Sequence, residues 1–346
     1  MIRINYLRSA IIFVLALLPF VSWSQARIVV AQNGSGDFKT IREAVNSVPD
    51  SSATLRIVFV KNGTYAEKVT IAKNNLLLQG EDRAKTIITG SISNVIYSIE
   101  HRDQYSGVVN LDGDDITISN MTIQNTFGKD VPDSLQYEYK DRFTGEMRKI
   151  GVGRTSHQFA LRSFKSTRLK VINCNILAWG ADTVSPWDSN EGMYYFKNCL
   201  MQGGVDFYCP RGWAYAEDCT FVCLSPTAAI WHDGGKDKSM KSVWNNCKFV
   251  GGPTTVSYKL GRYHHDSHFY LLNCTFDEKM QDVRIYKAAT AKPVYWGPRE
   301  YYYNCHRTGG DYDWFRNNLT EAPGSPSAED ITVQWTFDGK WNPLEK

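Results

Sequence analysis

The sequence lacks a strong net charge, a membrane-spanning apolar run and an early cysteine. Its formal charge is only +3, so bulk charge gives no sign of a nucleic-acid binder. The apolar run "AIIFVLALLPFV" is too short to cross a bilayer. Because the first cysteine is Cys174, we expect no lipoprotein anchor. With 346 residues, 42% of them hydrophobic and 22% charged, the chain is expected to build a sizeable core.

The first residues have the pattern of a secretory signal peptide. Two arginines precede the apolar run without any acid, and Ser22 and Ser24 give a small-residue cleavage pattern. We therefore expect residues 1–24 to be removed, with cleavage near Ser24–Ala26, and the mature chain to be secreted or periplasmic. Their loss lowers the formal charge from +3 to +1. A membrane anchor is the less favoured alternative, because the run is short.

Six of the eight cysteines occupy one repeated motif, in which an Asn or Asp precedes each cysteine, as in "VINCNI" and "LLNCTF". The six are Cys174, Cys199, Cys219, Cys247, Cys274 and Cys305. The motif recurs at a period of roughly 20–30 residues, which is typical of stacked repeats. Since free cysteine behaves as a small buried hydrophobe, we expect a column of cysteines facing one core rather than a disulfide framework. Cys209 and Cys223 lie outside this column, and the sequence leaves open whether they pair.

Short segments rich in β-branched and aromatic residues surround these cysteines, and no long amphipathic helices separate them. This pattern predicts an all-β fold, a right-handed parallel β-helix (a solenoid) in which each coil contacts its neighbours. Residues 25–346 are expected to form a single domain of this kind. From about residue 277, Tyr, Trp, Gly and Pro become frequent, which predicts a loop-rich C-terminal segment packed along the solenoid.

One short amphipathic helix is expected near the start, within "DFKTIREAVNSVP". Asp37 is its expected N-cap, and Pro49 is expected to end it. Its apolar face would consist of Phe38, Ile41, Ala44, Val45 and Val48. Such a helix would cap the N-terminal end of the β-helix, where strand edges are otherwise exposed.

Three polar residues recur at one interval inside apolar stretches. Asp182 lies midway in the sequence between Gln158 and Asp206, so coils of matching length would place the three about 4.8 Å apart at the backbone. Two carboxylates so close have pKa values pushed apart, which provides one ionised nucleophile or base and one protonated acid. Arg262, which would lie two coils beyond Asp206, would keep one of them ionised. The alternative is structural, with aspartates that make turns and Gln158 in an amide ladder.

A set of motifs follows in a specific order: "GSGDFKTIREAVNSVP", "VKNGTYAEKVTI", "LLQGEDRAKTIITG", "ITISNMTIQNTFG", "QFALR", "GADT", "GGVDF" and "LGR". In that order they resemble the pectin methylesterases, carbohydrate esterases built on a right-handed parallel β-helix. The resemblance covers about residues 28–275. It implies that Asp206 is the nucleophile and Asp182 the general acid/base. It also implies that Arg262 orients the nucleophile and contacts the uronate, and that Gln158 helps to bind the oxyanion.

The chain departs from the family pattern around this site. Ala181 stands where the family has a second glutamine that donates to the oxyanion, and losing one such donor costs about 10²–10³ in rate. Tyr263–His264 replaces a proline–tryptophan pair, and Cys209 and Pro210 replace an aromatic residue and a glycine. We expect His232 or a groove tyrosine to supply the missing donor, or the enzyme to be slow. The expected substrate-binding residues are Thr89, His232, Tyr263 and His264.

The sequence therefore predicts an exported esterase that removes methyl esters from a pectic polyuronide with an aspartate nucleophile. We expect no cofactor and no metal, because the histidines lack ligand spacing on any one element. A methyl-esterified polyuronide is the expected partner, with no nucleic acid, no membrane anchor and a monomeric chain. Two alternatives stay open: a catalytically weakened carbohydrate-binding protein on the same scaffold, or a β-helix polyuronide lyase.

Overall fold

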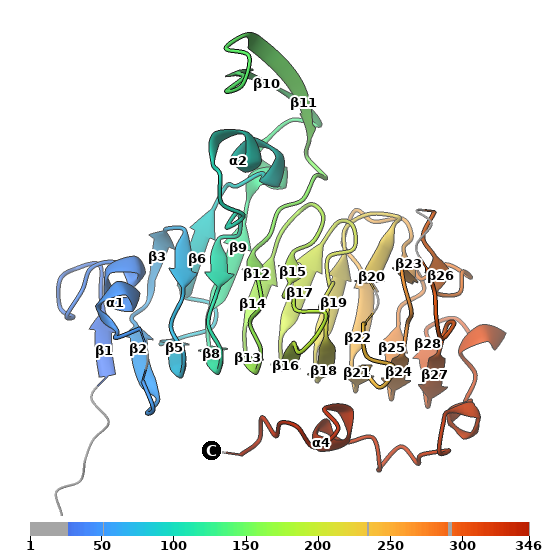
Figure 1. Cartoon of the computed structure of the whole chain (residues 1–346). Helices are drawn as coiled ribbons and strands as arrows, with labels where there is room; N and C mark the ends of the chain where they lie inside the picture. The colour runs from blue at the N-terminus through green and yellow to red at the C-terminus, as the bar shows by residue number, and fades with distance from the viewer. Residues whose placement is uncertain (1–26, 51, 234, 290–292, 346) are drawn as a thin grey trace, which may run out of the picture.

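The computed structural model describes residues 27–50, 52–233, 235–289 and 293–345. Its strands stack into an elongated solenoid that runs from β1 (Arg27–Val30) to β28 (His306–Arg307), as Figure 1 shows. Every pairing between named strands of the described residues is parallel except that of one hairpin. The expected parallel β-helix is thereby confirmed. The expected signal peptide, residues 1–24, and its cleavage near Ser24–Ala26 lie outside the described residues.

Three sheets form the walls of the solenoid. The first contains β1, β2 (Arg56–Val60), β5 (Leu76–Gly80), β8 (Ile116–Ser119), β13 (Leu169–Ile172), β16 (Met193–Lys197), β18 (Trp213–Glu217), β21 (Ser242–Asn245), β24 (Phe269–Leu272) and β27 (Glu300–Tyr303). The second contains β3 (Gly63–Ala66), β6 (Thr86–Gly90), β9 (Thr122–Asn125), β14 (Asn175–Leu177), β17 (Leu200–Gly203), β19 (Thr220–Cys223), β22 (Lys248–Gly251), β25 (Thr275–Phe276) and β28.

The third sheet is the one that carries the candidate site, and it has two parts. The first part contains β4 (Val69–Ile71), β7 (Val109–Leu111), β12 (Leu161–Ser163) and β15 (Val184–Ser185). The second part contains β20 (Ala228–His232), β23 (Lys259–Tyr263) and β26 (Tyr286–Lys287). Single parallel bridges from Val184 to Tyr208 and from Tyr208 to Ile230 connect the two parts.

The repeated Asn or Asp marks the corner between the first and second sheets. In each repeat it has a φ of 50–55°, the left-handed region that Asn and Asp tolerate better than other side-chain-bearing residues. These residues are Asn173, Asn198, Asp218, Asn246, Asn273 and Asn304. Their side chains bond along the axis: Asn173 Nδ2 donates to Asn120 Oδ1 at 2.8 Å, and Asn198 Nδ2 donates to Asn173 Oδ1 at 3.0 Å. The motif therefore encodes a backbone corner as well as a ladder of amides.

The six repeated cysteines lie in the core directly after this corner. All are buried, and all eight cysteines of the chain are free. Cys199 N–H donates to Cys219 Sγ at 3.4 Å, so neighbouring coils bring these residues into contact. Burial raises the pKa of the Cys174 thiol to about 12, which is typical of an unreactive structural thiol. The column is confirmed, and Cys209 and Cys223 do not pair.

The first helix, α1 (Ile41–Ser47), forms where the sequence predicts it, but its N-cap is Thr40 and not Asp37. Thr40 Oγ1 accepts from Glu43 N–H at 3.2 Å and donates to Glu43 Oε2 at 2.7 Å. Asp37 lies too early in the chain, and its carboxylate instead accepts from Val29 N–H at 2.7 Å. The helix packs against β1, β2 and β4. Its role as a cap over the first coil stays a prediction.

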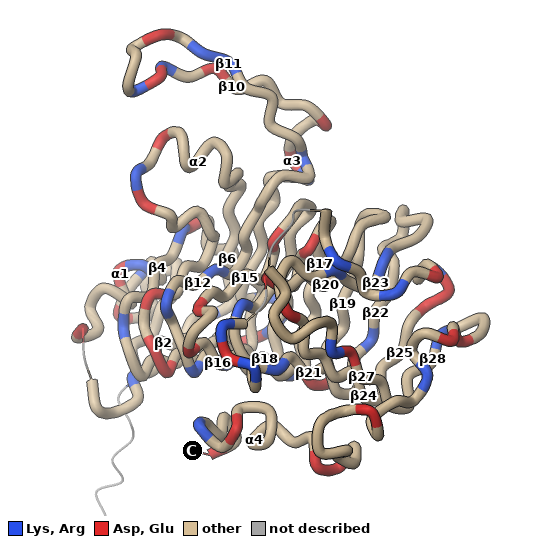
Figure 2. Tube along the Cα trace, turned by 45° about the vertical axis from the view of Figure 1, so that its right-hand side comes forward, with Lys and Arg blue, Asp and Glu red and all other residues tan. Residues whose placement is uncertain are grey.

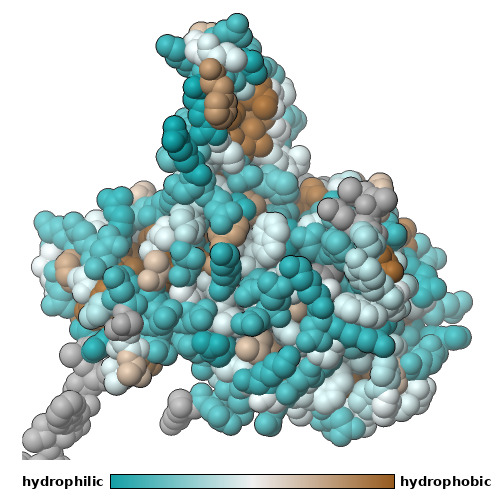
Figure 3. All heavy atoms as spheres, viewed as in Figure 1, coloured by the Kyte–Doolittle hydropathy of each residue, from teal (hydrophilic) through white to brown (hydrophobic). Residues whose placement is uncertain are grey.

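Two insertions rise above the coils on one side of the solenoid (Figure 1). One holds α2 (Asn94–Glu100), and the other holds α3 (Phe127–Asp130) with the hairpin β10 (Ser134–Lys140) and β11 (Met147–Gly153). Phe143 and Met147 of the hairpin are exposed, and Figure 3 shows apolar surface on this projection. No helix of the described residues is long and apolar enough to cross a membrane.

The stack of coils extends further toward the C-terminus than the composition predicts. β26, β27 and β28 all follow residue 277 and pair with β23, β24 and β25. The tyrosine-rich "EYYYNCHR" is therefore another strand–corner–strand unit rather than a loop. The segment after it holds η1 (Asp313–Phe315), η2 (Leu319–Glu321) and α4 (Val333–Thr336), and it runs back beneath the first sheet, where α4 contacts β18 (Figure 1).

Charged residues of both signs are interspersed along the solenoid and its insertions (Figure 2), in keeping with the small net charge of the chain. No face in that view is covered by one sign alone. An anionic ligand is therefore expected to be held by individual residues rather than by a broad basic surface.

Replacing a corner residue tests the backbone role of the motif. Asn246→Ala is expected to lower the free energy of unfolding by about 1–3 kcal/mol, because alanine is strained at a φ of 52° and the bond from Nδ2 to Asp218 Oδ1 is lost. Asn246→Gly is the matched control, since glycine adopts this φ freely and loses only the hydrogen bond. Urea unfolding followed by circular dichroism measures both. Equal losses in the two variants would contradict the corner argument.

Candidate active site

The third sheet brings the three equally spaced polar residues to one level on successive coils. Single parallel bridges join His157 to Ala181 and Ala181 to Val205. The residues that directly follow these three are Gln158, Asp182 and Asp206. Their backbones are linked in the same register, because Gln158 N–H donates to the carbonyl of Ala181 at 2.9 Å and Asp182 N–H to that of Val205 at 3.1 Å. The repeated interval is thus one turn of the solenoid.

Both aspartates occupy left-handed backbone positions. The φ of Asp182 is 57° and that of Asp206 is 45°, a region that costs most residues about 1–2 kcal/mol. Each residue therefore occupies a backbone conformation that aspartate tolerates better than most residues, which the structural alternative would also explain. Each carboxylate is nevertheless almost fully buried and placed against basic side chains, which a turn alone does not require.

Asp206 is held by Arg262 of β23. The Arg262 Nε atom lies 3.0 Å from Oδ1 and 3.2 Å from Oδ2, and Nη2 also donates to Oδ2. Burial raises the pKa of Asp206 to about 6, although Arg262 opposes this rise. The carboxylate is therefore mostly ionised at neutral pH yet poorly hydrated, a state that suits a nucleophile.

Asp182 has two basic neighbours that the sequence reasoning missed. Arg211 Nη2 lies 3.4 Å from Oδ2, and His157 Nε2 lies 3.5 Å from Oδ1. The side chain of Asp182 is 8% exposed, whereas that of His157 is 54% exposed, so the imidazole stands at the surface beside the acid. The available signals were positional: His157 directly precedes Gln158, and Arg211 follows closely after Asp206 in the sequence.

Arg211 is a buried cation shared by two carboxylates. Besides contacting Asp182, its Nε atom lies 2.7 Å from Asp233 Oδ2. The rings of Trp187 and Trp231 lie 4.5 and 4.3 Å from its guanidinium carbon. Burial lowers the pKa of Arg211, but the negative groups around it outweigh this effect and keep its pKa above the ordinary value. Arg211 therefore stays charged and links Asp182 to Asp233.

Gln158 reaches the predicted level but does not present its amide to solvent. The side chain is fully buried, Oε1 accepts from Gly128 N–H at 2.8 Å, and Nε2 donates to the carbonyl of Arg154. A Cβ on Gly180 would lie 2.2 Å from the Gln158 Nε2 atom, so this packing requires glycine there. In this arrangement Gln158 fixes α3 and the end of the hairpin.

Two of the predicted substrate-binding residues face away from a groove. Tyr263 is 8% exposed and belongs to the hydrophobic core, because alternate residues of β23 point to opposite faces and Arg262 takes the outer one. His232 is 4% exposed, its ring packs edge-on against Phe269, and burial lowers its pKa to about 4. Both are therefore buried residues, contrary to the expectation that they line the groove. The expectation that His232 supplies the missing donor fails for the same reason.

The other two predicted residues, Thr89 and His264, are partly exposed. His264 lies beside the site, with Nδ1 3.6 Å from Asp233 Oδ1. Thr89 lies on β6, and its Oγ1 accepts from Gln124 Nε2 at 3.1 Å. Thr89 pairs with Gln124 of β9, and Gln124 pairs with Leu177 of β14 on the coil after that. Their contacts with a substrate stay predictions. Within the described ranges, no three His, Cys, Asp or Glu side chains gather in a way that would hold a metal ion.

Comparison with known proteins identifies relatives of one kind. A family model described as Pectinesterase matches residues 27–136. The probable pectinesterase/pectinesterase inhibitor 58 of Arabidopsis thaliana is 27% identical over 243 residues, which cover 68% of this chain and 37% of that protein. Pectinesterase 1 of Solanum lycopersicum is 41% identical over 105 residues, which cover 30% of this chain and 19% of that protein. The chain spans half or less of the length of these curated relatives.

Solved structures of similar proteins share the whole fold. The pectin methylesterase PemA from Erwinia chrysanthemi superposes with a TM-score of 0.71 at 20% identity, covering 93% of this chain and 99% of that chain. A pectin methylesterase in complex with hexasaccharide VII gives 0.70 at 20% identity, covering 92% and 98%. At this identity the likeness establishes a parallel β-helix of the same kind. Together with the family model and the curated relatives, it supports the pectinesterases as the family that this chain resembles.

The raised pKa of Asp206 predicts how acidity affects stability. Because the folded state binds this proton more tightly than the unfolded chain, the buried carboxylate costs stability as the pH rises from about 4 to above 6. Asp206→Asn stays neutral at every pH. Its free energy of unfolding is therefore expected to rise, relative to that of the wild type, by up to about 3 kcal/mol between pH 4 and pH 7. Urea unfolding at several pH values measures the difference.

Asp311→Asn is the control, because the hydrogen bond from Arg307 N–H lowers the pKa of this exposed carboxyl. The Asp311 carboxylate contributes stability above the unfolded pKa, and this contribution is lost on acidification. The free energy of unfolding of Asp311→Asn is therefore expected to fall relative to that of the wild type as the pH rises. If the difference in free energy of unfolding between Asp206→Asn and the wild type does not change with pH, the raised pKa of the Asp206 carboxyl is contradicted.

Proposed function

We propose that the protein is a carboxylic ester hydrolase that removes methyl esters from a pectic polyuronide. One observation carries the proposal: a buried carboxylate, Asp206, is held by Arg262 and lies in register with a second buried carboxylate, Asp182. The pectinesterase relatives and the complex of a similar enzyme with a hexasaccharide support the reaction and the substrate class.

The reaction proceeds by nucleophilic catalysis. An Asp206 oxygen attacks the ester carbonyl carbon and forms a tetrahedral intermediate. Its collapse breaks the bond to the methoxy group, Asp182 gives this group a proton, and methanol leaves behind a mixed anhydride on Asp206. Ionised Asp182 then takes a proton from water, which attacks the anhydride and regenerates Asp206. One water is consumed, and one methanol and one uronic acid are formed.

The two arginines support opposite halves of this cycle. Arg262 orients Asp206 through two nitrogen atoms and keeps it ionised against the cost of burial. Arg211, 3.4 Å from Asp182, stabilises the negative charge that appears on this residue when the methanol proton leaves. Asp233 balances the charge of Arg211 from the other side.

We infer that His157 supplies the polar group that is absent at Ala181. The bridge between these residues makes their side chains neighbours on one face of adjacent coils. His157 Nε2 lies at the exposed side of Asp182, where the ester carbonyl must approach, whereas Gln158 and His232 are buried. A donor at this place would stabilise the oxyanion of the tetrahedral intermediate.

The second candidate function is a carbohydrate-binding protein with weakened catalysis. Ala181 and the buried amide of Gln158 favour it, since both remove expected oxyanion donors. Oligouronide binding without methanol release would identify it, and an unsaturated uronide product would identify the lyase alternative. For the esterase we further propose action outside the cytoplasm, in secreted or periplasmic form, as a monomer without metal or cofactor. The signal-peptide pattern of residues 1–24 supports the location.

Replacing the nucleophile tests the reaction. Asp206→Asn is expected to lower methanol release from esterified pectin by about 10³-fold or more, because the amide cannot form the anhydride. Asparagine tolerates the φ of 45°, so the melting temperature should not fall. The wild-type rate is expected to decline about tenfold per pH unit below about pH 6 as Asp206 becomes protonated. Asp311→Asn is the control, and an active Asp206→Asn protein would refute the role.

A pair of substitutions tests the replacement donor. His157→Ala is expected to lower kcat for methanol release by about 10²-fold, because an oxyanion donor is lost. Adding Ala181→Gln to that variant should recover part of the rate, since glutamine restores a donor on the neighbouring coil. Steady-state kinetics with one esterified substrate measure both. Unchanged kcat in His157→Ala would show that the imidazole does not contact the reacting carbonyl.

A further inference from the structure

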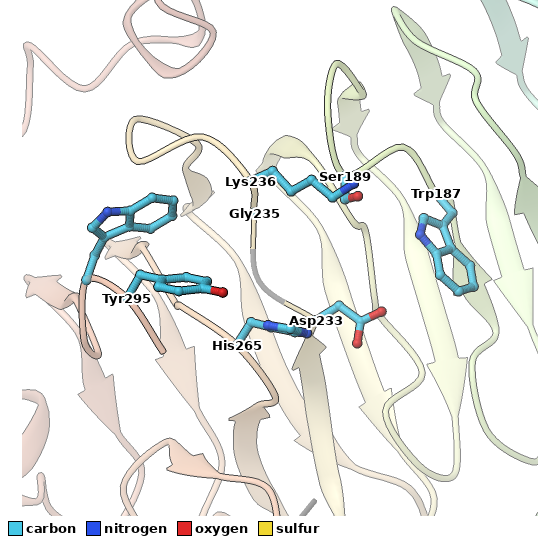
Figure 4. Close-up of a pocket in the computed structure, with 8 residues that line it drawn as sticks. Trp187, Ser189, Asp233, Gly235, Lys236, His265 and Tyr295 are labelled. Atoms are coloured by element: carbon cyan, nitrogen blue, oxygen red, sulfur yellow. The ribbon is translucent and has the colours of Figure 1, made fainter. Parts of the chain in front are cut away.

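Two pockets adjoin the loops that lead from the third sheet into the first. Figure 4 shows the pocket on the side of the candidate catalytic residues, where Trp187, Asp233, Ser189 and Lys236 lie. The second pocket, of about 370 Å³, includes the residues that directly follow Ser189 and Lys236, and it shares no lining residue with the first. Its volume falls within the range of small-ligand sites, roughly 300–1,000 Å³. We call it the indole pocket, and its lining residues are Asn190, Glu191, Met193, Trp213, Asp237 and Lys340.

The floor of the indole pocket contains a hydrogen-bond donor without an acceptor. Trp213 of β18 and Met193 of β16 are paired neighbours in the first sheet, and both are buried. Within the described residues, the buried Nε1–H group of Trp213 donates to no acceptor. Leaving a buried donor unsatisfied is costly, so a ligand that brings an oxygen to this place is favoured.

Lys340 lies over the indole ring but is not held there firmly. Its Nζ atom is 4.3 Å from the centre of the ring, and its side chain is 47% exposed. Its ion pair is with the exposed carboxylate of Asp237, 3.8 Å away, and a pair of this kind contributes little stability. The backbone that carries Lys340 is fixed, because Phe337 is fully buried and Asp338 pairs with the buried Lys241. The ammonium group can therefore leave the ring while the wall of the pocket stays in place.

The polar groups of the pocket favour an uncharged ligand that both donates and accepts hydrogen bonds. Glu191 is exposed, and no ion pair of the described residues includes it. Asp237 carries a second negative charge, because the hydrogen bond from Ser239 N–H lowers the pKa of this carboxyl. With one ammonium and two carboxylates, the lining side chains have a net charge of 1 − 2 = −1, which repels an anion. A sugar hydroxyl can accept from the indole N–H and donate to a carboxylate.

We propose that the indole pocket binds one uncharged sugar unit, which takes the place of the Lys340 ammonium over the Trp213 ring. One hydroxyl oxygen accepts from Trp213 Nε1–H, and other hydroxyls donate to the carboxylates of Glu191 and Asp237. This site takes part in no step of ester hydrolysis. The inference therefore goes beyond the proposed function and does not rest on it.

Solution NMR of the protein labelled with ¹⁵N in its tryptophans tests the site, because each indole N–H group gives its own signal. Trp213→Phe assigns the Trp213 signal by its loss. Galactose is expected to move that signal and to leave the signal of Trp244, whose buried indole belongs to the core and does not line the pocket. Galacturonate is expected to bind about threefold more weakly, because its carboxylate meets those of Glu191 and Asp237.

Two substitutions of exposed residues should change the Kd for galactose in opposite directions. Glu191→Ala is expected to raise the Kd about fivefold, because a sugar hydroxyl loses its acceptor. Lys340→Ala is expected to lower the Kd about threefold, since no ammonium has to be displaced from the ring. Lys248→Ala is the matched control, because Lys248 is an exposed lysine on β22 of the second sheet.

Galactotriose distinguishes the two sources of such a unit. Binding as tight as that of galactose identifies the end of a glycan chain, and loss of binding identifies the free sugar. The proposal is overturned if galactose moves the signal of Trp187 instead of that of Trp213, or moves neither. It is also overturned if galacturonate or a propylammonium ion binds as tightly as galactose, or if Glu191→Ala leaves the Kd unchanged. Methanol release plays no part in these measurements, so their result is independent of the proposed esterase.

Discussion

The hydrogen bonds that fix each coil in register on the next are the constraint on which the rest of this structure depends. They set the left-handed corner at every repeated Asn or Asp, and the corner places a cysteine in the core behind it. The same register turns equal spacing in the sequence into direct adjacency of Asp182 and Asp206. A slip of one residue would reverse the two faces of a strand, so the site and the core are specified together.

Charge burial is the cost of this site, and arginine pairing offsets it. Three carboxylates and two guanidinium groups form two linked units, Asp206 with Arg262 and Asp182 with Arg211 and Asp233. Removing either arginine would leave a buried carboxylate without its guanidinium partner, which is far more costly than losing an exposed ion pair. The indole rings packed on Arg211 shield it from water and hold it in position.

The surroundings of the two aspartates differ from the family pattern in a connected way. A short side chain at Ala181 leaves His157 as the exposed polar neighbour of the acid. Arg211, in the segment where Cys209 and Pro210 replace the usual residues, couples Asp182 to Asp233. The changes therefore surround both carboxylate oxygens of Asp182, with His157 beside Oδ1 and Arg211 beside Oδ2.

The sequence by itself determined the periodic features: the parallel β-helix, the cysteine column, and the level shared by Gln158, Asp182 and Asp206. These follow from spacing, which the coil length converts into position. Only the tertiary structure decided where side chains point and what they meet. It buried Tyr263 and the amide of Gln158, and it brought Arg211 between two acids. Such contacts depend on packing between coils, and a single sequence carries no periodic signal for them.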